Sequence, residues 1–171
     1  MKILGIDPGT AIVGFGLIEG HARPGRMAVL VECGVVRMKS GDSLPRRLSV
    51  IYAGIGELLA RYRPDAVAVE GIFYGPNVRT TVVLGHARGV ILLAAEEAGV
   101  PVWEYAPRLV KKTVVGTGGA LKPQVGYMVA KLLQLESPPR PADAADAVAV
   151  ALTHLLSPSR RPTAINGGAR R

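Results

Sequence analysis

Three β-rich segments follow one another closely at the start of the chain, and this order limits the folds that it can adopt. The segments are Lys2–Asp7, Ala11–Ile18 and Met27–Met38. They are separated by the turn-forming run Pro8–Thr10 and by a hairpin loop at Gly20–Arg26. Connections this short can join only antiparallel strands, so we predict a three-stranded antiparallel meander.

Helical and strand patterns alternate after the meander. Apolar residues recur at helical spacing from Ser43 to Arg63, and a compact apolar run at Ala66–Val69 is typical of a buried strand. The further expected elements are a helix at Val78–Ala98, a strand at Gly99–Glu104, and helices at Pro107–Val114, Pro123–Leu135 and Ala142–Leu156. The order is therefore βββαβαβ followed by helices, which indicates an α/β fold.

The length and composition favour one globular domain over 1–157. The chain has 171 residues, of which 49% are hydrophobic, enough for a proper core. Charge or glycine interrupts its apolar stretches, so we expect no membrane span, and the acid at Asp7 argues against a secretory segment. Cys33 is the only cysteine, which favours a reducing, cytoplasmic location. Residues 158–171 are basic and poor in apolar side chains, and we expect a disordered tail there.

The charge balance points to a polyanionic partner. The formal net charge is +8 at pH 7, and the segments Gly71–Ala95 and Tyr105–Leu135 contain no acid at all. Nucleic acid is the first candidate, with a merely soluble basic protein as the alternative.

Four carboxylates stand at the ends of otherwise apolar elements. Asp7 ends the first strand, Glu70 follows the most apolar strand, and Asp143 and Asp146 lie on one face at the start of an Ala/Val/Leu helix. Each has a structural alternative: Asp7 as an Asx-turn residue, Glu70 as the partner of an arginine, and Asp143 as a helix N-terminal charge. All four are hard to explain in this way together, because clustering buried carboxylates is costly.

Clustered carboxylates are the usual ligands of hard divalent cations. Magnesium and manganese prefer oxygen ligands, and two such ions about 4 Å apart can activate water and stabilise the leaving oxygen of a phosphoryl displacement. A basic surface around an acidic metal pocket is the charge distribution expected of a nuclease.

Other motifs carry less information. The glycine-rich run at Gly116–Pro123 lacks the residues of a phosphate-binding loop, and the three histidines have no cysteine partners at zinc spacing. We interpret His154 as structural and Cys33 as a small buried hydrophobe. Phe73 and Tyr74 follow Glu70 in a loop, where they can stack on unpaired bases or fold back onto the core.

Several ordered blocks resemble the bacterial RuvC family of Holliday junction resolvases. The resemblance covers Lys2 to about Leu156 and rests on these blocks: Gly5–Thr10, Val69–Glu70, Leu84–Val90, Tyr105–Lys111, Thr113–Gly116 and Ala142–Ala147. His86 and Gly71 depart from the residues common in the family.

The resemblance implies a fold, an activity and partners. The fold is ribonuclease H-like: a five-stranded mixed sheet, with an antiparallel meander plus parallel strands, flanked by helices. The implied activity is magnesium-dependent nicking of two opposed strands of a four-way DNA junction by a homodimer, leaving 5′-phosphate ends. The implied partners are the branch-migration proteins RuvA and RuvB, and the helix beginning near Val78 is the implied dimer surface.

The resemblance also implies roles for individual residues. Asp7, Glu70, Asp143 and Asp146 match the catalytic carboxylates that hold two Mg²⁺ ions, with Mn²⁺ as an alternative metal. Phe73 matches an aromatic residue that stacks on a base, and Lys111 and Lys122 match basic residues near the scissile phosphates. We add Tyr74, Arg79 and Lys112 as candidate DNA contacts.

Two other functions remain as alternatives. Asp7–Thr10 also resembles the first phosphate loop of actin-like and sugar kinases, although those enzymes need a second domain to close over ATP. A non-catalytic junction-binding protein is the other alternative, and it requires that the four acids be dispensable.

Overall fold

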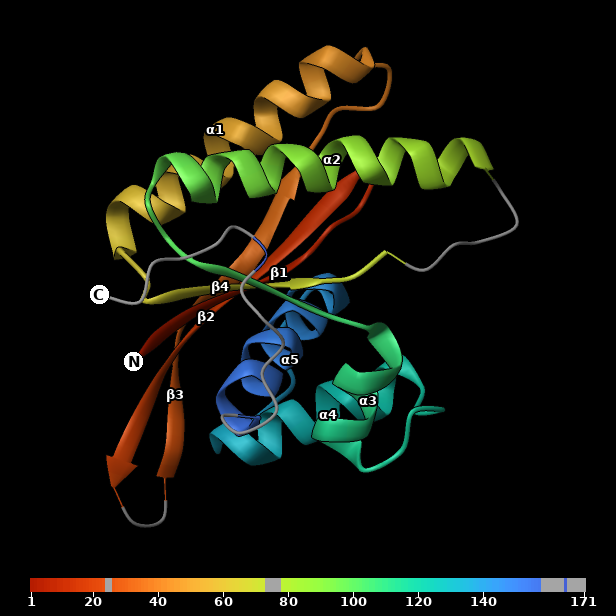
Figure 1. The fold of residues 1–171 in the computed structure, drawn as a ribbon. Helices are drawn as coiled ribbons and strands as arrows, with labels where there is room; N and C mark the ends of the chain where they lie inside the picture. The colour runs from red at the N-terminus through yellow and green to blue at the C-terminus, as the bar shows by residue number, and fades with distance from the viewer. Residues whose placement is uncertain (24–25, 73–77, 158–164, 166–171) are drawn as a thin grey trace.

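Five strands and five helices form three layers in the computed structural model, which describes residues 1–23, 26–72, 78–157 and 165. Figure 1 shows the sheet between α1 and α2 on one face and α3, α4 and α5 on the other. The elements are β1 (Lys2–Asp7), β2 (Ile12–Arg23), β3 (Arg26–Arg37), α1 (Leu44–Tyr62), β4 (Ala66–Glu70), α2 (Val78–Glu97), β5 (Val102–Tyr105), α3 (Pro107–Val115), α4 (Lys122–Leu133) and α5 (Ala142–Leu156).

The sheet is mixed, as expected. Its strand order is β3-β2-β1-β4-β5, with β1–β2 and β2–β3 antiparallel and β1–β4 and β4–β5 parallel. The predicted meander is therefore confirmed, and the β1 strand lies at the centre. Since β1 and β4 run in the same direction, their carboxyl ends lie side by side.

The first hairpin differs from the prediction. Most of the loop expected at Gly20–Arg26 belongs to β2 and β3, whose pairing continues from Gly20↔Ala28 to Arg23↔Arg26. Residues 24–25, between the two strands, lie outside the described residues. Main-chain pairing between the two strands continues into this segment, so residues typical of turns did not end the strands.

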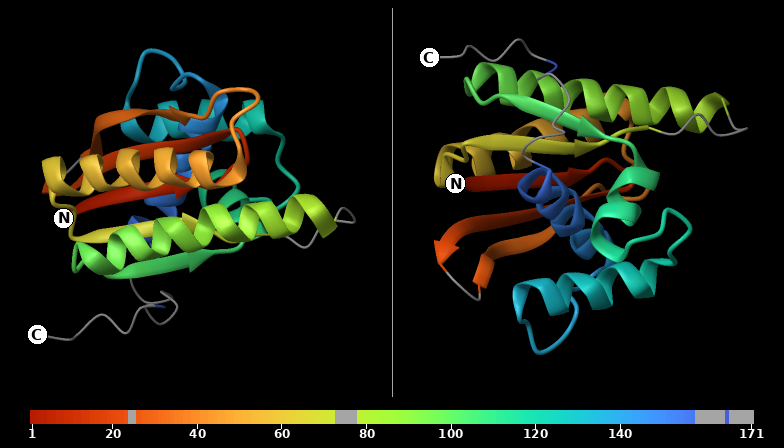
Figure 2. Two further views of the ribbon diagram at one scale, coloured as in Figure 1. Left: turned by 90° about the horizontal axis from the view of Figure 1, so that it is seen from above. Right: turned by 60° about the horizontal axis from the view of Figure 1, so that its bottom comes forward.

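Each face of the sheet has its own hydrophobic core. Leu4, Ile6 and Val69 face α1 and α2, where they pack with buried residues such as Ile55 and Ile91. The opposite face packs against α3, α4 and α5, with a core that includes Ile3, Ala68, Val129, Val148 and Leu152. The alternation of strand side chains between the two cores explains why β1 and β4 are apolar on both faces. Figure 2 shows these layers from two further directions.

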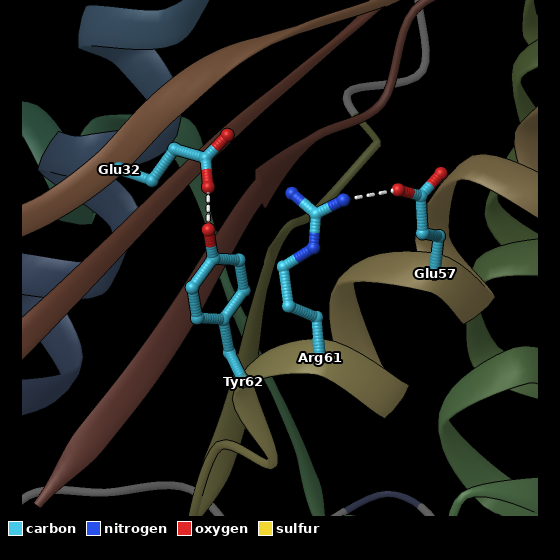
Figure 3. Close-up of polar contacts among 4 residues, drawn as sticks. All are labelled: Glu32, Glu57, Arg61 and Tyr62. Atoms are coloured by element: carbon cyan, nitrogen blue, oxygen red, sulfur yellow. Dashed lines mark hydrogen bonds and ion pairs between the residues drawn. The ribbon is translucent and has the colours of Figure 1, made fainter.

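Helix α1 begins and ends with recognisable signals. Pro45 lies in its first turn, and Arg63 ends it in the left-handed conformation (φ 44°), donating its N–H to Leu59 O at 3.0 Å. The Tyr62 hydroxyl donates a hydrogen bond to Glu32 of β3, which ties the end of the helix to the sheet (Figure 3). The Arg61–Glu57 ion pair beside it (2.5 Å) is exposed and contributes little to stability.

Helix α2 is the element that bears on the expectation of no membrane-spanning segment. By length and composition it is the one helix in the described part of the chain that could cross a membrane, and an 18-residue window in it has a mean hydropathy of 1.3. Its buried side chains Ala87, Ile91, Ala94 and Ala95 pack against the sheet and α1, as in a helix that covers a sheet. Its opposite side leaves Val78, Val82 and Leu93 exposed.

Three smaller expectations have mixed outcomes. His154 is fully buried with Nδ1 2.8 Å from the Tyr105 hydroxyl, in agreement with a structural role. Cys33 packs against the core on the α5 face but is only partly buried, because β3 is an edge strand, so its interpretation as a small buried hydrophobe holds only in part. Of the tail expected at 158–171, the structure describes only Ile165, whose N–H donates to Val102 O at 2.9 Å.

Candidate active site

Asp7 and Glu70 lie at the carboxyl ends of two neighbouring parallel strands. Ile6 of β1 is paired with Val69 of β4, so the next residues, Asp7 and Glu70, emerge together at the same edge of the sheet. Their side chains share a hydrogen bond. The parallel register thus explains how two acids distant in sequence come into contact.

Glycines allow α5 to bring the other two acids to the same place. A Cβ on Gly14 would lie 2.1 Å from Asp143 O, and one on Gly5 would lie 2.1 Å from Ala147 O. Contacts this close are possible only for strand residues without a side chain. Gly14 is also the residue paired with Asp7, so the first turn of α5 lies directly against the end of β1.

Asp7, Asp143 and Asp146 form a compact cluster of oxygens. One carboxylate oxygen from each lies within 4.8 Å of the others. Oxygens bound to one magnesium ion are at most about 4.2 Å apart, so small side-chain movements suffice for shared binding. Glu70 lines the same cavity of about 240 Å³, together with Asp7 and Asp146. The donor set therefore fits a hard divalent cation.

Burial and mutual repulsion raise the pKa values of the two strand-end acids. The pKa of Asp7 is raised to about 6, first by burial and then by the charge of Asp146. The pKa of Glu70 is raised to about 8, first by burial and then by Asp7. Without a cation, the pair therefore retains about one proton near neutral pH. A dication would remove this repulsion and favour the ionised forms.

Lys122 supplies a positive charge at the same site. It is the first residue of α4, where Gln124 Oε1 accepts the N–H of Leu121 at 2.7 Å and fixes the start of the helix. Its Nζ lies 2.6 Å from Asp146 Oδ2 and 3.9 Å from Asp143 Oδ1. The hydrogen bond to Asp146 is the main reason that the pKa of Lys122 lies above its usual value.

The structure brings some of the expected DNA contacts to this cavity and separates others from it. Lys111 lines the cavity beside Lys122, whereas its neighbour Lys112 is exposed and does not. Successive helix residues point about 100° apart, so only one of the two lysines can face the carboxylates. Arg79 lines a different cavity, and Phe73 and Tyr74 lie outside the described residues.

The structure bears on two of the structural alternatives: an arginine partner for Glu70 and a helix N-terminal role for Asp143. Arg88 forms a bidentate pair with Glu104 of β5 (2.6 and 2.8 Å), and no ion pair among the described residues joins an arginine to Glu70. Asp143 does lie in the first turn of α5, where it also stabilises the helix N-terminus.

Sequence reasoning missed the glycines that shape the site. Gly5, Gly14 and Gly16 each contact α5 so closely that a Cβ would lie within 2.4 Å of a helix atom. The available signal was an alternation of glycine in a strand together with an alanine-rich helix, which together indicate a close strand–helix contact.

The chain is similar to proteins of one family over most of its length. The family model described as "Crossover junction endodeoxyribonuclease RuvC" matches residues 3–154. A protein of that name from Moorella thermoacetica is 53% identical over 154 residues, which cover 90% of each chain.

Solved structures agree with these matches. A RuvC structure from Thermus thermophilus has a TM-score of 0.83 and 40% identity and covers 91% of this chain and 94% of its own. A T. thermophilus RuvC in complex with Holliday junction substrate has a TM-score of 0.82 and 38% identity, with the same coverage. The expected ribonuclease H-like fold is therefore confirmed.

Proposed function

The chain belongs to the RuvC family of crossover junction endodeoxyribonucleases, and from this we infer that it is an endonuclease that resolves Holliday junctions. The observation that supports this function in the molecule itself is the convergence of Asp7, Glu70, Asp143 and Asp146 from three separate elements. A non-catalytic junction-binding protein would have no need for such a cluster, because it raises pKa values and costs stability.

We assign metal binding to these four carboxylates. Asp7 stands between Glu70 on one side and the α5 pair on the other, so it would hold metal together with either of them. Bound divalent cations would activate the attacking water and stabilise the leaving oxygen. We propose two Mg²⁺ ions in each site, with Mn²⁺ as a substitute, and products with 5′-phosphate and 3′-hydroxyl ends.

We assign contacts with the scissile phosphate of the DNA to Lys122 and Lys111. Lys122 donates a hydrogen bond to Asp146 and is largely exposed, so a phosphate entering the cavity can contact its ammonium. Its positive charge opposes the negative charge that builds up on the phosphate oxygens in the transition state. Lys111 lines the same cavity and orients the same phosphate.

The remaining assignments concern DNA and partners. We propose that Phe73 stacks on a base near the junction centre, with Tyr74 beside it, and that Lys112 contacts an outer phosphate. Phe73→Ala is then expected to impair junction nicking more than duplex binding, and equal losses in both assays would contradict the stacking role.

We further propose a homodimer with two active sites, which matches the near-twofold symmetry of a four-way junction. The exposed apolar side of α2, with Val82 and Leu93, is the proposed contact surface. RuvA and RuvB are the proposed partners in a cytoplasmic repair system. Residues 1–157 are the proposed nuclease domain, and 158–171 the basic tail.

A nicking assay tests the central proposal. A synthetic four-way junction, a fork and a linear duplex are incubated with the protein in Mg²⁺, in Mn²⁺ and in EDTA. We expect paired nicks in opposed strands of the junction, none in EDTA and little cleavage of the duplex. Tight junction binding without nicking in either metal would favour the non-catalytic alternative.

A further inference from the structure

A second cavity, whose only charged lining residues among those described are arginines, lies close to the active site, on the face of the sheet that α1 and α2 cover. Its volume is about 360 Å³, and its walls are Thr10, Leu44, Arg47, Arg79, Thr80 and Val83. The described residues that line it include two arginines and no acid. In Figure 1 both helices begin at the same end of the molecule, where β1 finishes.

The main chain, and not a carboxylate, holds Arg47 in place. Its Nε donates to Asp42 O at 3.0 Å and its Nη1 to Thr10 O at 3.3 Å. A guanidinium has five N–H donors, so within the described ranges three remain for another acceptor. No ion pair in those ranges joins Arg47 or Arg79 to an acid. A guanidinium that is already ordered loses little side-chain entropy when an anion binds.

The positions of the two arginines do not favour the stability of the fold. Arg79 is the second residue of α2 and Arg47 the fourth of α1, and neither helix has an acid in its first turn. A helix N-terminus carries positive partial charge and repels cations, so these positions normally favour Asp or Glu. An anion in the cavity would relieve the repulsion at both helices.

The position of the cavity restricts the identity of that anion. Thr10 follows Asp7 by three residues, so their Cα atoms are at most about 11 Å apart. Phosphates on one DNA strand follow each other every 3.4 Å or so along the helix axis. A strand with its scissile phosphate at Asp7 therefore has other phosphodiesters within reach of Arg47.

We propose that Thr10, Arg47 and Arg79 form a second phosphate-binding site, which holds the cleaved strand a few nucleotides from the cut. The proposal rests on the proposed function and adds to it a contact on the face of the sheet opposite Lys111 and Lys122. The strand is then held on both sides of the carboxylates, which fixes the scissile phosphate between them.

Binding to junctions with single neutral phosphates tests the second site. The cut is first mapped with wild-type protein in Mg²⁺; methylphosphonates are then placed one at a time at the phosphates around it, and affinity is measured in EDTA. Arg79→Gln and Arg47→Gln are compared with Arg46→Gln, an exposed neighbour on α1 that does not line the cavity.

We expect one position near the cut to be sensitive. A methylphosphonate there should weaken junction binding by the wild-type protein and by Arg46→Gln about tenfold. It should leave junction binding by Arg47→Gln and Arg79→Gln unchanged. Each of those two variants should also lower the slope of log K against log salt by about one. Melting temperatures identify any loss of folding in Arg47→Gln. If that variant is destabilised, Arg79→Gln provides the deciding measurement, because the Arg79 side chain forms no hydrogen bond or ion pair among the described residues.

The proposal of a second site would be wrong if Arg47→Gln and Arg79→Gln both kept the wild-type affinity and salt slope. It would also be wrong if each methylphosphonate weakened binding by both variants as much as binding by the wild-type protein. These results are separate from the mapping step, in which an absence of nicking by the wild-type protein would count against the proposed function itself.

Discussion

A Cβ on Gly14 would lie 2.1 Å from the main-chain oxygen of Asp143. The same glycine is paired with Asp7 across β1 and β2. One residue without a side chain therefore determines how closely α5 can bring its acids to the central strand. The geometry of the proposed metal site depends on this contact as much as on the carboxylates themselves.

Replacing Gly14 by alanine should separate the acids. The added methyl group pushes α5 away from β2, and we expect a loss of about 1–3 kcal/mol in the free energy of unfolding. Nicking should fall about 100-fold, because displacement of a catalytic group by about 1 Å has effects of that size. Urea denaturation and single-turnover nicking measure the two losses.

The matched control is Gly56→Ala. No atom lies within 4 Å of a Cβ at Gly56 in α1, and alanine there should stabilise the helix by about 0.5–1 kcal/mol without a change in nicking. Wild-type nicking by Gly14→Ala would show that the close contact is not needed.

Neutralising Asp7 should separate binding from chemistry. Asp7→Asn keeps the shape of the side chain and removes one negative charge, so junction affinity in EDTA should be unchanged or higher. Nicking in Mg²⁺ should fall at least about 1000-fold, because the central ligand is lost. Asp65→Asn is the control, since the Asp65 carboxylate accepts the N–H of Lys2 (2.7 Å) at the other end of β1. Comparable nicking by both variants would contradict the metal-binding role.

Lys122→Ala should change the pH dependence of nicking as well as its rate. Lys122 lowers the pKa of both Asp7 and Glu70, so its removal should move the acidic limb of the pH–rate profile to higher pH. We expect a rate loss of about 10–100-fold from the missing charge. Lys131→Ala on the same helix removes a lysine that contacts the Tyr127 ring instead, and it should keep the wild-type profile. A profile without displacement in Lys122→Ala would remove the electrostatic link to the carboxylates.

Metal-free protein should become less stable as pH rises. The folded-state pKa values of Asp7 and Glu70 are raised to about 6 and about 8, so the folded protein holds protons that the unfolded chain has lost. The free energy of unfolding should therefore fall between about pH 4 and about pH 8, as the folded protein loses these protons.

Urea denaturation in EDTA across this range measures the fall, and the same series in Mg²⁺ should be flatter because the ion compensates the ionised carboxylates. Glu70→Gln should remove much of the decrease in the free energy of unfolding with pH in EDTA. A wild-type stability that rises across the range in EDTA would contradict the raised pKa values.

The sequence alone determined the order of the elements and the identity of the four acids. Strand alternation, helical spacing and turn residues depend on neighbours a few positions apart, so β1, α1, α2 and α5 could be predicted to within a few residues. The acids were recognisable because each interrupts or ends an apolar element, where a lone charge is costly.

The tertiary structure decided which side chains meet. The choice of Lys111 over Lys112, the pairing of Lys122 with Asp146 and the placing of Arg79 beside Arg47 depend on how helices lie on the sheet. That arrangement results from contacts between residues far apart in sequence, such as Gly5 with Ala147, and no local pattern encodes their distances. Pairing between β2 and β3 likewise extends both strands into a segment whose residues favour a turn.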